Sequence, residues 1–303
     1  MEPARQRGGL RVNSDPTVVV GVDGSPSSLA AVAWAAADAA RRRCRLEVVH
    51  AYIWPTVYAP VPGPVLSPYE DGVREAAERA LTDAAEHART VSPGLAVRTD
   101  LRLQGPSAAL VEASRHAVTV VVGNRGHGGF TSLLLGSVGA ALAAHAACPV
   151  VIVRHDVRPL SAEAGRVLVG VDGSHDAELA LRFAFEQASY RGVGLTAALA
   201  YQWPASSGPG DMLPLPYDQD DLREDEQRAL AESMAGWAGR YPDVDVRHTP
   251  VQGRPAAVLT ALSAGAELLV VGSRGRGGFT GLLLGSVSQA AIRHAACPVA
   301  VVR

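Results

Sequence analysis

Residues 123–137 read GNRGHGGFTSLLLGS, and residues 272–286 read GSRGRGGFTGLLLGS. Both stretches share the spacing G-x2-G-x9-G-S, and each lies between a short apolar run and a segment of helical composition. Glycines let the backbone turn tightly and bring its N–H groups close to a ligand. The unpaired N–H groups at a helix start favour an anion. The alternative is a glycine-rich turn without a ligand, but two copies with identical spacing favour a phosphate-binding loop in each.

The two loops belong to a repeat that covers most of the chain. The loops, the two VGVDGS segments and the two HAACPV segments are each separated by 149 residues. A period of this length is typical of a duplicated domain and not of a solenoid. We therefore expect a disordered tail at 1–15, a first domain at 16–155, a linker at 156–165 and a second domain at 166–303.

Strand and helix patterns alternate within each repeat. Short β-branched runs predict strands buried on both faces, and Ser-Pro at 25–26 predicts a helix start. In the first domain we expect strands at 17–22, 46–53, 95–103, 118–123 and 150–154, helices at 26–43, 69–90, 107–117 and 137–147, and a proline-rich loop at 54–68. The second domain repeats this order, with its own proline-rich loop at 204–216. The alternation predicts an α/β fold of two tandem Rossmann-like domains, each a parallel sheet with helices on both faces.

The composition excludes several classes of protein. A net charge of −2 gives no bulk electrostatic reason to expect nucleic acid or an acidic membrane as a partner. No stretch is long and apolar enough to span a bilayer, and 1–15 lacks the apolar segment of a secretory signal. All 28 basic residues are arginine, which rules out a Walker A loop with its lysine and any Schiff-base chemistry.

Three cysteines do not make a disulfide framework. Cys148 and Cys297 each follow a histidine by three residues, so each pair is half of a conceivable metal site. Each motif offers two ligands and stands where a helix must stop before proline. We interpret both cysteines as small buried hydrophobic residues.

Asp23 and Asp172 follow the first strands of their domains, at the edge of the sheet where open α/β folds bind ligands. We interpret them as ligand contacts, with an aspartate in a glycine-containing turn as the alternative. Ala51 and Ala200 follow the second strands, and small residues there leave backbone groups open to a nucleobase.

Arg125 and Arg274 lie inside the glycine loops, and the sequence leaves open whether they face phosphates or solvent. His50 ends the second strand of the first domain, and its counterpart is Leu199. A catalytic histidine is expected in both copies or in neither, so we interpret His50 as packed or hydrogen-bonded. With no repeated general base, the sites are predicted to hold a nucleotide more than to turn it over.

These motifs together resemble the universal stress protein family over nearly the whole chain, in the tandem-domain form found in actinobacteria. The resemblance implies the adenine nucleotide α-hydrolase-like fold, with five parallel strands of order 3-2-1-4-5 and four helices per domain. It also implies the ATP-binding branch of the family, with Mg2+ bound mainly through the phosphates. The residues that would meet the nucleotide are Asp23, Ala51, Gly123, Arg125, Gly126, Gly136, Ser137 and Val138 in the first domain, and Asp172, Ala200, Gly272, Arg274, Gly275, Gly285, Ser286, Val287 and Ser288 in the second.

The resemblance has further implications. The fifth strands, at 150–153 and 299–302, would pair antiparallel inside one chain, and two chains would form a homodimer. The function implied is that of a cytoplasmic, nucleotide-dependent regulator in stress or dormancy, acting on an unknown protein partner. A slow ATPase or nucleotidyl hydrolase and a nucleotide-independent scaffold are the alternatives. Where Ser288 would add a hydroxyl contact to phosphate, the first domain has Gly139.

Overall fold

The computed structural model describes residues 16–53, 67–126, 135–154, 165–202, 219–276 and 283–303. The expected tail at 1–15 and the loop at 204–216 lie outside these residues. So do the expected linker, apart from Gly165, and the loop at 54–68, apart from the two residues that begin a helix.

The first half alternates strands and helices as the sequence predicts. Its elements in chain order are β1 (Thr17–Gly21), α1 (Pro26–Arg42), β2 (Arg45–Ala51), α2 (Ser67–Val91), β3 (Val97–Arg102), α3 (Pro106–Ala113), β4 (Ala117–Gly123), α4 (Ser137–His145) and β5 (Val150–Val153). The expected helix at 107–117 was wrong at its end, because α3 stops at Ala113 and Ala117 already belongs to β4. The Ser114 hydroxyl stands at this end, where it donates to Val111 O and accepts from Ala147 N.

The second half repeats the same order. Its elements are β6 (Arg166–Gly170), α5 (His175–Arg191), β7 (Leu195–Tyr201), α6 (Gln219–Ala238), β8 (Val246–Gln252), α7 (Pro255–Leu262), a 3-10 turn (Ser263–Gly265), β9 (Ala266–Gly272), α8 (Ser286–His294) and β10 (Val299–Val302). Ser263 takes the role of Ser114 in this half, since its hydroxyl accepts from Ala296 N at 2.9 Å.

The strands form one ten-stranded sheet of order β3-β2-β1-β4-β5-β10-β9-β6-β7-β8. Each half has the predicted order 3-2-1-4-5, and all pairings within a half are parallel. The order reverses between β1 and β4, and between β6 and β9. Such a reversal opens a crevice at the carboxyl ends of the strands, and this is where both glycine loops lie.

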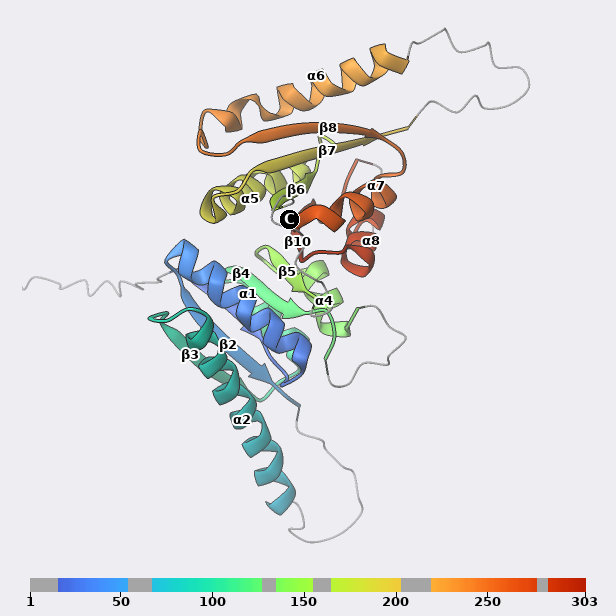
Figure 1. Cartoon of the computed structure of the whole chain (residues 1–303). Helices are drawn as coiled ribbons and strands as arrows, with labels where there is room; N and C mark the ends of the chain where they lie inside the picture. The colour runs from blue at the N-terminus through green and yellow to red at the C-terminus, as the bar shows by residue number, and fades with distance from the viewer. Residues whose placement is uncertain (1–15, 54–66, 127–134, 155–164, 203–218, 277–282) are drawn as a thin grey trace, which may run out of the picture.

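The two halves meet at their fifth strands. β5 and β10 pair antiparallel, with Ala300 opposite Val151, as the resemblance to the universal stress protein family implied. Figure 1 shows the two halves one above the other, joined at these strands. The sheet is therefore continuous through the whole molecule.

An arginine after each fifth strand crosses this seam. Arg154 Nη1 donates to Arg293 O at 3.0 Å, at the carboxyl end of α8. Arg303 donates in the same way to Ala144 O, at the carboxyl end of α4. A cation at the carboxyl end of a helix is favourable. Each half therefore stabilises the helix that follows the glycine loop of the other half.

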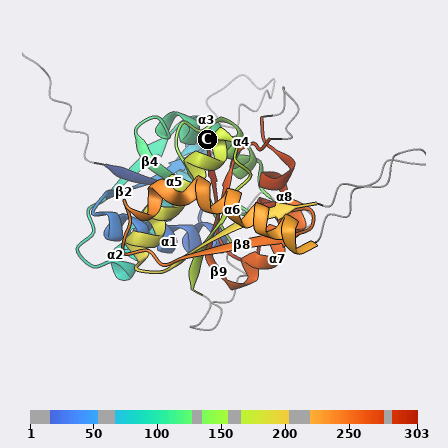
Figure 2. The ribbon, with the colours of Figure 1, turned by 90° about the horizontal axis from the view of Figure 1, so that it is seen from above.

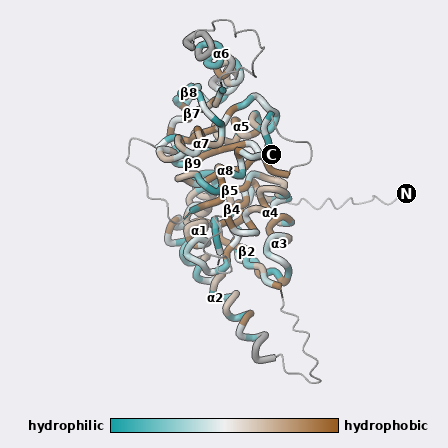
Figure 3. The backbone as a smooth tube through the Cα atoms, turned by 90° about the vertical axis from the view of Figure 1, so that its right-hand side faces the viewer, coloured by the Kyte–Doolittle hydropathy of each residue, from teal (hydrophilic) through white to brown (hydrophobic). Residues whose placement is uncertain are grey.

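Helices cover both faces of the sheet. One face packs against α1, α2, α5 and α6, and the other packs against α3, α4, α7 and α8. Seen from above, α1 and α2 lie on the opposite side of the first half from α3 and α4 (Figure 2). Alternate strand residues serve the two cores: Val18 and Val20 face the first, and Val19 faces the second. In Figure 3 hydrophobic colours run along the central strands, as two covered faces require.

A second contact between the halves joins α1 and α5. Asp38 is fully buried there, with its Oδ2 2.9 Å from Arg42 Nε and its Oδ1 accepting from Arg191 Nη1 at 3.3 Å. Arg191 also donates to Gln187 Oε1. Burial lowers the pKa of Arg191, and the Asp38 carboxylate opposes that shift.

The aromatic rings of the opposite helix cover both guanidinium groups. Arg42 lies 5.2 Å from the ring centres of Phe183 and Tyr190, and Arg191 lies 5.1 Å from that of Trp34. The two arginines occupy equivalent positions of the repeat, but they share one carboxylate, since Gln187 stands where the first half has Asp38.

Candidate functional site

The site in each half begins where its first strand ends. Asp23 and Asp172 stand in the turns that lead from β1 to α1 and from β6 to α5. Each carboxylate accepts from the backbone N–H two residues later, Ser25 N and Ser174 N, at 3.0 Å. The same serines cap the helices, because Ser25 Oγ accepts from Ser28 N and Ser174 Oγ from Ala177 N, both at 3.2 Å.

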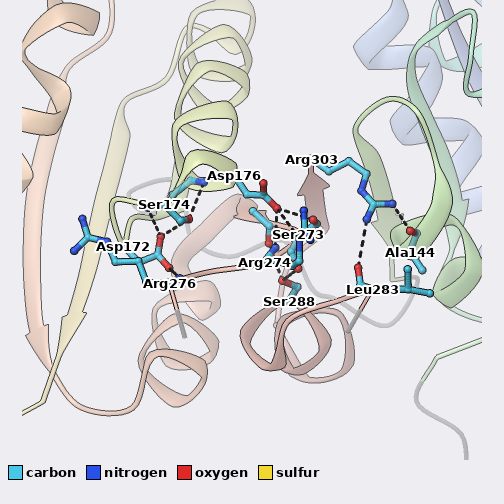
Figure 4. Close-up of polar contacts among 12 residues, drawn as sticks. Ala144, Asp172, Ser174, Asp176, Ser273, Arg274, Arg276, Leu283, Ser288 and Arg303 are labelled. Atoms are coloured by element: carbon cyan, nitrogen blue, oxygen red, sulfur yellow. Dashed lines mark hydrogen bonds and ion pairs between the residues drawn. The ribbon is translucent and has the colours of Figure 1, made fainter. Parts of the chain in front are cut away.

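The Asp172 carboxylate also fastens the glycine loop to this turn. Its Oδ2 accepts from Arg276 N at 2.9 Å, and its Oδ1 accepts from Ser174 Oγ at 2.6 Å (Figure 4). Asp172 therefore has the role in the turn that was our alternative interpretation. It also borders a cavity, as a ligand contact would.

Two glycines of each loop are required by close approach. A Cβ on Gly126 would overlap the Asp23 carboxylate, and one on Gly275 would overlap that of Asp172. A Cβ on Gly123 would stand 2.7 Å from Ser27 O, which belongs to the backbone of α1. A larger residue at Gly126 or Gly275 would displace either the carboxylate or the loop, and one at Gly123 would press on helix backbone; each change disturbs the site.

The loops end at the N-termini of α4 and α8. Gly136 and Gly285 cap these helices, and neither helix start has a side-chain cap. The backbone instead ties each cap to its loop, since Gly136 N donates to Asn124 O at 2.9 Å and Gly285 N to Ser273 O at 2.8 Å. The first-turn N–H groups, at Ser137 and Ser286, are left to a ligand.

A cavity lies at each switch point. The N-terminal cavity, bordered by the described ends of the loop 123–137, has a volume of about 410 Å³. The C-terminal cavity, bordered by the described ends of the loop 272–286, has a volume of about 520 Å³. Both are in the range of small-molecule sites. The structure brings every predicted site residue to its cavity: Asp23, Ala51, Gly123, Arg125, Gly126, Gly136, Ser137 and Val138 border the N-terminal one. Asp172, Ala200, Gly272, Arg274, Gly275, Gly285, Ser286, Val287 and Ser288 border the C-terminal one.

Sequence reasoning missed the walls supplied by the third helices. Pro106 and Leu110 of α3 border the N-terminal cavity, and Pro255 and Leu259 of α7 border the C-terminal one, together with Arg254. The repeat carried a signal for them, because the prolines and leucines recur at the same 149-residue spacing.

The loop arginines differ in their surroundings. Arg125 Nε is buried and has no hydrogen-bond partner among the described residues, although it borders the N-terminal cavity. A buried donor without a partner is costly, so an anion in the cavity would relieve it. Arg274 is exposed, and its Nε lies 3.7 Å from Asp176 Oδ2.

Ser288 has other partners than the expected phosphate. Its hydroxyl donates to Gly272 O at 2.7 Å and lies 3.1 Å from Ser273 O, and the side chain is buried (Figure 4). Since a hydroxyl has one proton to donate, Ser288 fixes the loop to α8 in this arrangement. The equivalent residue of the first half, Gly139, has no hydroxyl and cannot form this hydrogen bond.

Comparisons with known proteins agree with this geometry. The model of the universal stress protein family matches residues 16–154 and 163–303. The chain belongs to the universal stress protein family. A universal stress protein of Mycobacterium tuberculosis is 42% identical over 293 residues, covering 94% of this chain and 96% of the relative. Another, from Mycolicibacterium smegmatis, is 40% identical over 290 residues, with coverage of 94% and 96%.

A solved universal stress protein from Archaeoglobus fulgidus shares the fold. It superposes with a TM-score of 0.67 at 22% identity and covers 96% of each chain. The two relatives and the solved structure therefore each match this chain over nearly their whole length.

His50 packs beside the N-terminal site of this universal stress protein without entering its cavity. Its ring lies 6.3 Å from that of Tyr52, and its Nδ1 is buried without a partner among the described residues. Burial lowers the pKa of His50, whereas the charge of Asp23 and a hydrogen bond with the Val22 backbone raise it. The packed and hydrogen-bonded side chain agrees with our interpretation of the sequence.

The cysteines are buried, as predicted, and burial raises the pKa of Cys148 and Cys297 to about 12. In the part of the chain that the structure describes, no three histidine, cysteine, aspartate or glutamate side chains gather as a metal site. None of the helices described is both long enough and apolar enough to cross a membrane.

Proposed function

We propose that this universal stress protein binds ATP in both cavities and acts as a nucleotide-dependent regulator in the stress response. Membership of the universal stress protein family supports the stress-response role. The choice of ATP rests on the site. The observation that carries it is the pair of cavities at equivalent switch points. Each is bordered by a loop glycine packed against an aspartate and by the first N–H groups of a helix.

The residues of each cavity suit the parts of a nucleotide. Apolar walls from Leu110 and Leu259 and the small residues Ala51 and Ala200 leave room for an adenine ring. The first-turn N–H groups of α4 and α8 are suited to phosphate oxygens. Bound ATP would bring Mg2+ with it, coordinated mainly by the phosphates.

We propose that the sites hold ATP more than they hydrolyse it. The chain has no lysine to neutralise a leaving phosphate, and the counterpart of His50 in the second half is Leu199. A slow ATPase is the competing possibility, and release of ADP at steady state, lost on Asp172→Ala, would favour it.

We further expect a cytoplasmic protein that acts through a protein partner and as a homodimer. Because β5 and β10 pair within one chain, a homodimer must use another surface. Light scattering with and without ATP measures the mass, and a monomer in both states would contradict the homodimer.

The test is to purify the full chain without added nucleotide, denature it and identify any released small molecule by its mass. Isothermal titration with ATP and Mg2+ then gives the stoichiometry, for which we expect two ATP per chain. Gly126→Val and Gly275→Val place a side chain against Asp23 and Asp172, so each should remove one of the two sites.

Gly236→Ala is the matched control, because no atom lies within 4 Å of the added Cβ in α6. It should leave both sites intact. Absence of any released nucleotide, together with no heat of binding for ATP and Mg2+, would overturn the proposal and favour the nucleotide-independent scaffold.

A further inference from the structure

The two cavities differ in charge. Three arginines, Arg254, Arg274 and Arg276, and one aspartate, Asp172, border the C-terminal cavity. The described residues that border the N-terminal cavity include one arginine, Arg125, and one aspartate, Asp23. The counterpart of Arg276 in the repeat is His127, which lies outside the described residues.

Two of the three arginines supply the excess positive charge. The charge of Arg274 is partly offset by the Asp176 carboxylate. This carboxylate accepts hydrogen bonds from Arg274 N at 3.0 Å and from Ser273 Oγ at 2.7 Å. Within the described residues, neither Arg254 nor Arg276 forms an ion pair. Figure 4 shows the Arg276 side chain at the Asp172 end of this group, apart from Asp176.

Arg254 has a direct counterpart for comparison. It precedes α7, and Gly105 precedes α3 at the equivalent position. Their backbone angles are nearly equal, φ −71° and ψ 128° for Arg254 against φ −58° and ψ 133° for Gly105. A Cβ on Gly105 would meet Ile53 at 3.5 Å, an ordinary contact, so the backbone of either half accepts either residue.

Residues at the carboxyl ends of the second and third strands also differ in polarity between the two halves. Ile53 and Leu103, at the ends of the second and third strands of the first half, are each 68% exposed. Their counterparts in the second half are Gln202 and Gln252, which are also exposed. At these two positions the edge of the sheet is thus apolar in the first half and polar in the second.

We propose that the C-terminal cavity selects nucleotides with a di- or triphosphate, whereas the N-terminal cavity discriminates little between these and a monophosphate. This inference rests on the proposed nucleotide-binding function and assigns a different ligand class to each site. Arg254 is the specificity-determining residue that the two halves do not share. A cleft bordered by unpaired cations strengthens binding in proportion to the negative charge of the ligand.

The experiment uses full chains with one site blocked. Gly126→Val leaves the C-terminal cavity open, and Gly275→Val leaves the N-terminal one open. Isothermal titration gives Kd for ATP, ADP and AMP at fixed Mg2+ and salt, and the quantity compared is the ratio of Kd for AMP to Kd for ATP. We expect this ratio to be at least tenfold higher for the C-terminal cavity, and to fall as salt is raised.

A reciprocal exchange tests the residue itself. Arg254→Gly should lower the ratio of the C-terminal cavity by about fivefold or more, and Gly105→Arg should raise that of the N-terminal cavity in the same proportion. Both exchanges are also made in the otherwise unmodified chain, where a two-site fit gives the same ratios if a blocking variant fails to fold. Circular dichroism checks the fold of each variant.

The outcomes separate the two proposals. Equal ratios at the two cavities, or ratios that neither exchange changes, would overturn this inference and leave ATP binding intact. A complete lack of ATP binding by the unmodified chain would overturn the proposed function and this inference with it.

Discussion

At the scale of single residues, the thiols of Cys148 and Cys297 show how burial sets chemistry in this protein. Both side chains pack in the core beneath β4 and β9, and neither is more than 8% exposed. Burial disfavours the thiolate, which is why their pKa rises from 9.0 to about 12. These thiols are therefore poor nucleophiles while the protein is folded.

This pKa shift predicts a loss of stability in mild alkali. Below the unfolded pKa the thiols are protonated in both states; above it the unfolded state loses protons that the folded state keeps, so stability falls as pH rises. Between pH 8.5 and 9.5 we expect a loss of about 0.7 kcal/mol per thiol in the free energy of unfolding. Urea denaturation at both pH values measures it.

The matched variants are Cys148→Ala and Cys297→Ala. Each is less stable overall because it leaves a small cavity, but each should lose less stability between the two pH values than the unmodified chain. The absence of lysine removes the commonest other group that titrates nearby. An unchanged pH dependence in both variants would contradict the prediction.

At the scale of elements, the loop and the first helix of each half are fitted to each other through Gly123 and Gly272. A Cβ on Gly123 would stand 2.7 Å from Ser27 O, and one on Gly272 2.9 Å from the backbone carbon of Asp176. Both contacts are with helix backbone, which cannot rotate away as a side chain can.

Gly123→Ala should therefore push α1 from the end of β4 and lower the free energy of unfolding by about 1–3 kcal/mol. ATP affinity at the N-terminal cavity should fall with it, while the C-terminal cavity keeps its affinity. Thermal denaturation and titration measure the two effects. If Gly123→Ala proves as stable as Gly236→Ala, the close packing of this helix is not what requires the glycine.

The elements also show what the sequence could predict. Among the described residues, the β-branched runs and the repeat were sufficient for the order of the strands and α-helices, and for the three loop glycines that line each cavity. The end of α3 was not predictable, because Ser114 marks it through a hydrogen bond with Ala147, a residue distant in sequence. Likewise, Ser288 carries the residue type of a phosphate contact, and its bonds to two loop carbonyls are visible only in the fold.

At the scale of the whole molecule, the contact between α1 and α5 depends on one buried carboxylate. Asp38 serves two guanidinium groups, on Arg42 and Arg191, whose side chains are 8% and 4% exposed. No sequence pattern predicts this cluster, because Asp38 and Arg191 belong to different halves.

Asp38→Asn should leave Arg42 without a charge partner among the described residues, and Arg191 with only the Glu267 carboxylate, whose Oε2 lies 3.9 Å from Arg191 Nε. The free energy of unfolding should fall by about 3–5 kcal/mol. Gln187→Glu restores a carboxylate at the equivalent position, so the double variant should recover much of the loss. Urea denaturation of the unmodified chain, the two single variants and the double variant gives a double-mutant cycle. If Gln187→Glu stabilises the Asp38→Asn chain no more than it does the unmodified one, the two positions are not interchangeable.

The single sheet has two outer strands, β3 and β8, and the outer edge of each pairs with no other strand in the described part of the chain. These edges decide whether copies of the protein can add to the sheet. Open edges invite pairing between chains and, in the extreme, fibres. β3 carries Arg98, Asp100 and Arg102, and β8 carries Arg247 and, in its centre, a proline that has no N–H to donate. Both ends of the sheet therefore resist the addition of a further strand, and a crowded cell can hold many copies without their sheets merging.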